Sequence, residues 1–430
     1  MKSGGRIKIG LCVLLAFVYG CSGSLAKPRD GNGWNVIIIL VDAMRFDHLG
    51  CYGYKKNTSP NMDRISQEGL VFENAISQGA STKAAVAAMF TSRYLKRFDS
   101  KPINYALPSS ALTLAEVLLA HGYTTQGIYD NGMVHKGTGF EQGFEGYTAV
   151  GPDRDKTSYA LNWIERNSQK KFFMYIHYMA PHADYDPPEG YKEKFRSGYN
   201  GKIDFKGKHQ EFFNGTVLSA EDVTELRARY DGEINYIDDE VGRLEGYLRE
   251  KGLLEKTVLV IMADHGEALA ENGVVGHGWP LNSVVQVPLI VRLPGGHHPQ
   301  RVNQVVESID IAPSLLAQLN MAVPLSFRGV NVFDVERVKE KRAFSQAKTS
   351  WVLIRDGAFM FKTNGKDGFL YDLKADPFEH TDIAGNSPGQ MKDLMSAYHA
   401  FQARRDGLEM EYRPADADTK ERLKALGYLQ

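Results

Sequence analysis

The sequence predicts an α/β fold with a doubly wound, mostly parallel sheet and a small C-terminal α+β subdomain. Three observations lead to this expectation. Near-continuous apolar runs recur between residues 35 and 293, which is typical of strands buried on both faces. Stretches with helical periodicity separate these runs, as in βαβ units. After about residue 335, short apolar runs are joined by Asp-Gly and Asn-Gly turns, which indicates an antiparallel meander.

The N-terminus has the form of an export signal. Three basic residues precede the apolar segment 9–20, which is too short to span a bilayer. Cys21 follows in a context that resembles the lipobox of bacterial lipoproteins; a plain signal peptide with an incidental cysteine is the alternative. We therefore expect residues 1–21 to be a signal peptide and residues 22–34 a polar tether. The protein is then exported to the periplasm or cell envelope, with a lipid anchor at the membrane.

The elements of the main domain can be placed in order along the chain. Strands are expected at residues 35–42, 124–130, 171–179, 257–264 and 287–293, and helices at 110–122 and 226–252. Because 430 residues exceed what one small core normally fills, we assign residues 35–335 to a large catalytic domain. Residues 336–430 form the C-terminal subdomain and tail, where a helix near 389–405 could cover the meander.

The composition excludes some classes of function. The chain is 43% hydrophobic and 24% charged, with a formal net charge of −1. It has no basic excess to neutralise phosphates, so we expect no nucleic-acid partner. Of its three cysteines, Cys12 and Cys21 lie in the N-terminal segment. Cys51 is left without a partner, so no disulfide framework is expected.

Residue types that bind metals or transfer protons follow three of the expected strands. Asp42 ends the first, His177 and His182 lie at and just after the end of the third, and Asp264 and His265 follow the fourth. A lone aspartate at a strand end is more often a helix cap or turn former. Ligands in open α/β sheets bind beyond the carboxyl ends of the strands. Three such ends therefore predict a common site.

A nucleophile is expected at residue 81 or 82. Ser81 and Thr82 precede an alanine-rich helical stretch, so their hydroxyls lie at a helix N-terminus, which suits a tetrahedral anion. Lys83 adds a positive charge nearby. The same pair could be a simple N-cap, and the residues alone do not separate Ser81 from Thr82.

Five segments occur in an order that is specific to one family. They are LVDAMRFDHLGCYGY, STKAAVAAMFTSRY, FFMYIHYMAPHADYDPP, ADHGEALAENGVVGHG and VPLIVRLPG. Their ordered combination resembles the sulfatase family, which belongs to the alkaline phosphatase superfamily. The resemblance extends over roughly residues 35–385, and it implies the α/β fold and an ester hydrolase or transferase activity.

The resemblance implies the nucleophile and the metal ligands. In the family, the nucleophile lies nine places before the threonine of a Thr-Gly dipeptide. Counting back from Thr91, which serine follows here, selects Thr82. Asp42, Asp264 and His265 fall on metal-ligand positions, with the oxygen of Thr82 as a further ligand.

The resemblance also implies residues that act on the substrate. His182 matches the histidine of the family's Pro-His motif, which contacts the substrate or leaving group. His277 falls where many members carry a substrate-binding lysine or histidine. We expect Lys83 to stabilise charge on the transferred group, and His182 or His277 to protonate the leaving oxygen.

Two departures from the family pattern change the expected chemistry. Sulfatases proper carry Cys or Ser in a C/S-x-P-x-R context that is oxidised to formylglycine, whereas this chain has TKAAV. Many members have a second acid after the first ligand, where this chain has Ala43. One oxygen ligand is therefore absent, so a single Zn²⁺ or Mn²⁺ ion is favoured, with Ca²⁺ or Mg²⁺ as alternatives.

These features favour a metal-dependent hydrolase or transferase of phosphate or sulfate esters in which Thr82 attacks directly. The site resembles the unmodified threonine sites of lipoteichoic acid synthases and phosphoethanolamine transferases, which favours phosphoester or phosphodiester chemistry. The expected substrate is an anionic ester, such as an envelope lipid or glycan. A sulfatase in the literal sense and a non-catalytic sulfatase-like binding protein are the alternatives.

Overall fold

The computed structural model describes residues 33–96, 104–196, 198–201, 203–205, 216–296, 300–404 and 406–414. The expected signal peptide with Cys21 and all but two residues of the expected tether lie outside these ranges. Within the described ranges, no helix is both long enough and apolar enough to cross a membrane.

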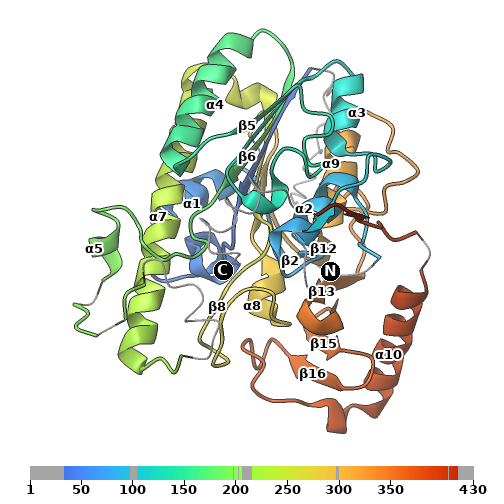
Figure 1. The fold of residues 1–430 in the computed structure, drawn as a ribbon. Helices are drawn as coiled ribbons and strands as arrows, with labels where there is room; N and C mark the ends of the chain where they lie inside the picture. Colours follow the sequence, from blue (N-terminus) through green and yellow to red (C-terminus); the bar gives the residue numbers. More distant parts are fainter. Residues whose placement is uncertain are drawn as a thin grey trace, which may run out of the picture.

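A nine-stranded mixed sheet forms the centre of the molecule, in the order β10-β2-β11-β7-β1-β6-β4-β5 with β12 paired to β2 (Figure 1). Its strands are β1 (Asn35–Val41), β2 (Leu70–Ile76), β4 (Thr124–Tyr129), β5 (Gly146–Ala149), β6 (Phe172–Tyr178), β7 (Thr257–Ala263), β10 (Gln286–Val287), β11 (Leu289–Arg292) and β12 (Gln300–Glu307). The strands β7, β1, β6, β4 and β5 pair in parallel. The predicted mostly parallel sheet is confirmed.

Several strands of the main sheet depart from the sequence-based expectation, among them β5 and β12, which fall outside every predicted strand. The segment expected as a parallel strand at 287–293 contains β11, which pairs antiparallel with both β7 and β2. Its connection from β7 holds only short elements, namely β8 (Ala268–Leu269), β9 (Val275–Gly276), α8 (Asn282–Val285) and β10. Because a parallel strand needs a crossover, usually a helix, the chain returns in the opposite direction. The strand β2 escaped prediction because Glu73 and Asn74 interrupt its apolar run.

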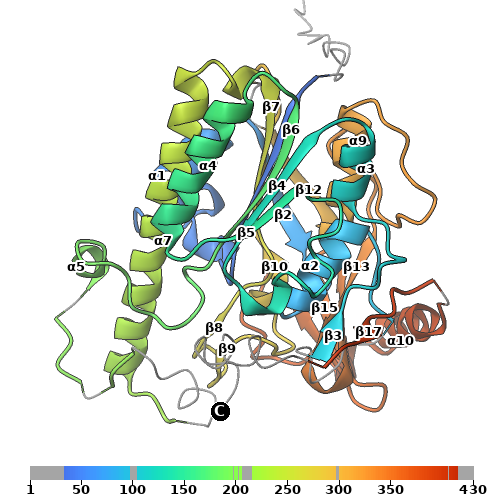
Figure 2. The ribbon, with the colours of Figure 1, turned by 45° about the horizontal axis from the view of Figure 1, so that its top comes forward.

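Helices cover both faces of the sheet, as a doubly wound fold requires (Figure 2). One side carries α1 (Pro60–Ser66), α4 (Asp153–Asn167) and α7 (Ala220–Glu250), and the other α2 (Thr82–Thr91), α3 (Leu114–Ala120) and α9 (Ile311–Gln318). The small helix α5 (Lys192–Phe195) lies beside α7. The predicted helix at 226–252 starts earlier, at Ala220, because Ser219 and Asp222 form a capping box.

The C-terminal subdomain is an antiparallel sheet with one covering helix (Figure 1). Its elements are β13 (Arg342–Ala347), β14 (Trp351–Asp356), β15 (Phe359–Thr363), β16 (Gly368–Asp372) and α10 (Pro388–Ala403). The strands β3 (Tyr105–Ala106) and β17 (Glu411–Tyr412) form a separate two-stranded antiparallel sheet. Gln346 of β13 accepts a backbone hydrogen bond from Ala80 N–H (3.0 Å) and donates one to the Gln78 carbonyl (3.2 Å). The subdomain is thereby fastened to the loop that precedes α2.

Helix α7 holds the turn that follows β1. The buried hydroxyl of Tyr230 donates to the Ala43 carbonyl (2.6 Å) and accepts from the Arg45 backbone N–H (2.8 Å). Ala43 has a φ of 58°, a left-handed conformation that residues with a Cβ atom adopt rarely. The hydrogen bonds from Tyr230 therefore help to hold Ala43 in a backbone conformation that alanine does not favour.

We predict that Tyr230→Phe lowers the free energy of unfolding by about 1–3 kcal/mol, because it leaves two buried backbone groups without their partner. Chemical denaturation would measure the loss. Tyr236→Phe is the matched control, since Tyr236 on the same helix accepts one hydrogen bond, from Arg154 N–H (2.9 Å). Equal stability of Tyr230→Phe and the unaltered protein would contradict the role of this contact.

Candidate active site

Four predicted site residues converge beyond the carboxyl ends of β1 and β7. Asp42 directly follows β1, Asp264 and His265 follow β7, and Thr82 is the first residue of α2. The Nε2 atom of His265 lies 3.5 Å from Asp42 Oδ1, 3.4 Å from Asp264 Oδ2 and 3.4 Å from Thr82 Oγ1. All four side chains are buried. The metal-ligand set implied by the resemblance is therefore a single cluster in space.

The structure separates the two hydroxyls that the residues alone left open. Thr82 Oγ1 lies within 3.5 Å of both Asp42 Oδ2 and His265 Nε2. Ser81 has an extended backbone (φ −160°) and makes no side-chain capping bond. Its Oγ has no hydrogen-bond partner among the described residues. Thr82 is thus the hydroxyl that faces the carboxylates.

The tautomer of His265 directs a lone pair into this cluster. Its Nδ1 lies 2.8 Å from the Gly266 carbonyl oxygen. A carbonyl only accepts hydrogen bonds, so Nδ1 carries a proton, and in the neutral ring Nε2 holds the lone pair that a metal would bind. Residue 266 must be glycine, because a Cβ atom there would lie 2.1 Å from the Ser283 carbonyl oxygen.

Two buried carboxylates oppose one another in the cluster. Burial works against ionisation of Asp42, but the imidazoles of His182, His177 and His265 hold its pKa well below the usual range. Burial and the negative charge of Asp42 raise the pKa of Asp264. The oxygens Asp42 Oδ1 and Asp264 Oδ2 are buried and have no hydrogen-bond partner among the described residues. Buried carboxylates are stable only where positive charge or hydrogen bonds compensate them, and a bound cation would supply such charge.

The donor set fits a divalent cation. The oxygens without partners both face His265 Nε2, at 3.4–3.5 Å. Neighbouring ligands of a tetrahedral ion with bonds of about 2.1 Å have this spacing. Within the described residues, the side chains of Asp42, His177 and Asp264 and those of His265, Glu267 and His277 are also close enough to hold a metal.

Asn131 and His177 complete the surroundings of Asp42. Asn131 Nδ2 donates to Asp42 Oδ2 (2.6 Å) and lies 3.4 Å from Thr82 Oγ1. His177 Nε2 lies 3.2 Å from the same oxygen of Asp42. From the sequence, His177 was expected only as a strand-end residue, and Asn131 was not predicted. Asn131 lies two residues after the end of β4, so polar residues just beyond an apolar strand were a signal that could have found it.

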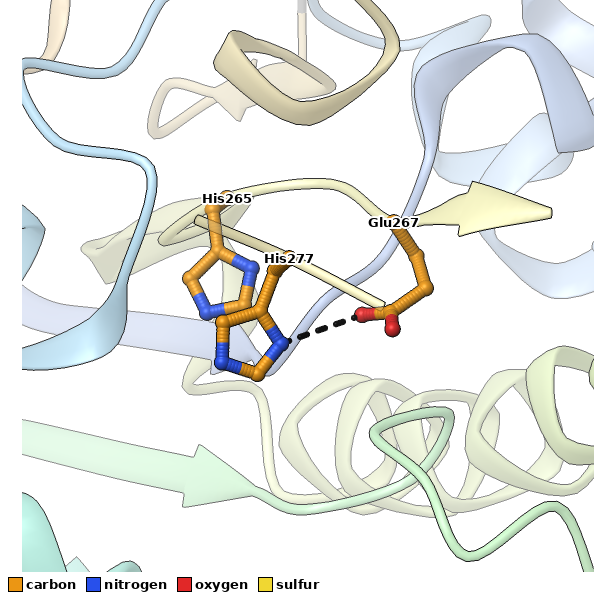
Figure 3. Close-up of side chains that lie close together, drawn as sticks. All are labelled: His265, Glu267 and His277. Atoms are coloured by element: carbon orange, nitrogen blue, oxygen red, sulfur yellow. Dashed lines mark ion pairs between the residues drawn. The ribbon is translucent and has the colours of Figure 1, made fainter. Parts of the chain in front are cut away.

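Three histidine rings line one side of the cluster. The His277 ring stacks on His265, with centroids 4.3 Å apart, and lies 5.0 Å from the His182 ring. Glu267, which the sequence analysis missed, is buried with Oε2 3.4 Å from His277 Nδ1 (Figure 3). Tyr185 donates to its other oxygen (2.8 Å). Burial and the nearby His265 lower the pKa of His277 to about 4.

Lys83 is buried, and its Nζ donates to the Tyr105 carbonyl at 2.7 Å. This bond joins α2 to β3. Burial lowers the pKa of Lys83 to about 7. Its expected action on the transferred group stays a prediction.

Comparison with known proteins gives one family. The family model "Sulfatase" matches residues 34–321. An arylsulfatase from Clostridium perfringens is 24% identical over 437 residues, with 81% of this chain and 90% of that protein covered. The multifunctional alkaline phosphatase superfamily protein PehA from Trinickia caryophylli is also 24% identical, over 473 residues, with coverage of 82% and 91%.

Solved structures share the fold. A protein in complex with its substrate D-glucosamine-2-N,6-O-disulfate has a TM-score of 0.73 at 18% identity, covering 87% of this chain and 99% of that chain. A phosphonate monoester hydrolase of Agrobacterium radiobacter has a TM-score of 0.68 at 20% identity, covering 88% and 97%.

The family match covers more than half of the chain and includes the strands that carry Asp42, Asp264 and His265. The chain therefore belongs to the sulfatase family, a family of ester hydrolases in the alkaline phosphatase superfamily.

Proposed function

We infer that this protein is a metal-dependent ester hydrolase or transferase in which unmodified Thr82 is the nucleophile. Phosphate esters, phosphodiesters or phosphonates are its preferred substrates. The observation that carries this proposal is the position of the Thr82 hydroxyl at the N-terminus of α2, within 3.5 Å of Asp42 and His265.

One divalent cation would be held by Asp42, Asp264, His265 and the oxygen of Thr82. An imidazole with oxygen ligands suits Zn²⁺ or Mn²⁺ better than Ca²⁺ or Mg²⁺. When bound, the ion would supply Lewis-acid stabilisation of negative charge near the reacting ester.

The residues of the chain would do the remaining work. Thr82 Oγ1 bonds to phosphorus and gives its proton to Asp264, whose pKa is raised by burial and by Asp42, whereas the pKa of Asp42 is held well below its usual range. The bond to the leaving oxygen breaks, and His182 protonates that oxygen, since a pKa of about 4 leaves His277 without an acidic proton at neutral pH. Asn131 Nδ2, 3.4 Å from Thr82 Oγ1, orients the hydroxyl. Water or a second alcohol then releases the phosphoryl group from threonine.

The choice of phosphorus over sulfur rests on residue 82 and its neighbours. The sequence around it lacks the Cys, Pro and Arg of the formylglycine context. Phosphonate monoester hydrolases from Agrobacterium radiobacter and Silicibacter pomeroyi share the fold, with TM-scores of 0.68 and 0.69. A sulfatase in the literal sense is the second candidate, because relatives such as the Clostridium perfringens protein carry that name.

We predict that Thr82→Ala lowers kcat for p-nitrophenyl phosphate or bis-p-nitrophenyl phosphate at least about a thousandfold, because it removes the attacking atom. Ser81→Ala, one residue earlier, should change kcat only a few-fold. Hydrolysis of p-nitrophenyl sulfate by the same preparations compares the two ester classes. Sulfate turnover faster than phosphoester turnover, or activity that survives Thr82→Ala, would overturn the proposal.

Removal of the metal gives a separate test. We predict that dialysis against a chelator abolishes activity, that about one equivalent of Zn²⁺ or Mn²⁺ restores it, and that Asp264→Asn prevents metal uptake. Elemental analysis would measure the stoichiometry. Asp310→Asn is the matched control, since Asp310 is equally buried but bonds to Lys341 (2.6 Å), outside the site. Activity that persists after the metal has been removed would contradict the mechanism, and a protein that stays inactive with Zn²⁺ or Mn²⁺ restored would favour a binding role.

The N-terminal sequence supports a further part of the proposal, that the protein is exported and anchored by a lipid on Cys21. Envelope lipids or glycans would then be within reach. Labelled palmitate should be incorporated by the native chain and not by Cys21→Ala, and equal labelling of both would contradict the anchor.

A further inference from the structure

The two oxygens of Asp42 have different surroundings. Oδ2 lies 2.6 Å from Asn131 Nδ2 and 3.2 Å from His177 Nε2. Oδ1 is buried and has no hydrogen-bond partner within the described ranges. His265 Nε2 faces Oδ1, at 3.5 Å. One oxygen of the carboxylate is therefore held by neighbouring side chains, and the other is available to bind a cation.

A second residue fixes the tautomer of His177. The hydroxyl of Tyr175 lies 3.0 Å from His177 Nδ1, and both side chains are fully buried. The two residues are two positions apart on β6, so they lie on the same face of the sheet. Burial, and next to it the negative groups nearby, raise the pKa of Tyr175 well above its ordinary value, so the hydroxyl keeps its proton.

When the His177 ring is neutral, only one direction of hydrogen bonding satisfies all three residues. An ionised carboxylate is purely an acceptor, so His177 Nε2 must carry the proton that faces Asp42. Nδ1 is then the acceptor, and the Tyr175 hydroxyl is its donor. The opposite tautomer would set a nitrogen lone pair against the carboxylate.

We propose that Tyr175 and His177 are positioning residues that hold Asp42 Oδ2 and so reserve Oδ1 for the cation. This inference rests on the metal site of the proposed function. His177 lies close enough to Asp42 and Asp264 to be considered a ligand itself. However, its Nε2 contacts the oxygen that is already bonded, whereas the open oxygens of both carboxylates face His265.

The expected effect is on metal affinity. Outer partners of metal ligands typically contribute 10–100-fold to affinity. Without the Tyr175–His177 pair, the Asp42 carboxylate could turn, and binding would have to restore its orientation. We expect Tyr175→Phe and His177→Leu to weaken Mn²⁺ binding by about 10–100-fold.

Two variants separate positioning from general damage. His177→Gln keeps an N–H donor near the position of Nε2 and should recover most of the affinity lost in His177→Leu. Tyr178→Phe removes a buried hydroxyl from the same strand, one that contacts Thr157 (2.8 Å), and should leave Mn²⁺ affinity within about twofold. Competition with a chromophoric chelator measures the dissociation constants. The absorption spectrum of bound Co²⁺ should be alike in all variants, because the ligands do not change.

The outcomes distinguish a failure of this inference from a failure of the proposed function on which it rests. If the unaltered protein binds no Mn²⁺, the proposed function fails and the inference fails with it. If it binds Mn²⁺ and Tyr175→Phe and His177→Leu bind equally well, the inference alone fails. A changed Co²⁺ spectrum in His177→Gln would make His177 a ligand and overturn its positioning role. An equal loss in Tyr178→Phe would also overturn it.

Discussion

The structure of the site depends on one constraint: the carboxylates of Asp42 and Asp264 are buried next to each other, and their negative charge must be compensated. Val41 of β1 and Ala263 of β7 are paired in register, so the parallel strands deliver Asp42 and Asp264 to the same place. Isolated buried carboxylates are strongly destabilising. The chain itself stabilises one of these carboxylates, because the backbone N–H groups of Ala43 and His265 donate to Asp264 Oδ1 at 3.2 and 2.8 Å. A cation bound between Asp42 Oδ1 and Asp264 Oδ2 would compensate the remaining negative charge.

The sequence predicted the fold well where hydrophobic pattern alone decides the structure. The runs that became β1, β6 and β7 are apolar on both faces, because helices cover both sides of the sheet. Strand direction depends instead on the connection. The strand β11 runs antiparallel because no crossover helix precedes it. The apolar residues of β11 itself do not indicate the direction of the strand. The strand β2 was missed because its polar residues Glu73 and Asn74 are only partly buried.

The site was predictable to the extent that its residues end strands or match family motifs. Asp42 and Asp264 follow apolar runs, so their convergence could be expected before the strand order was known. Asn131 gives the same signal more weakly, because asparagine after a strand usually forms a turn. Glu267 gave no signal of its own, since its position beside His277 depends on the fold of the loop after β7. Tertiary contacts of this kind are not encoded in local patterns.

The most direct test of a cation between the two carboxylates is anomalous diffraction from crystals of the protein grown with Mn²⁺. We predict one strong anomalous peak bounded by Asp42 Oδ1, Asp264 Oδ2 and His265 Nε2, with Thr82 Oγ1 beside it. A peak between Glu267 and His277 with none at Asp42, or no peak in metal-saturated crystals, would contradict it.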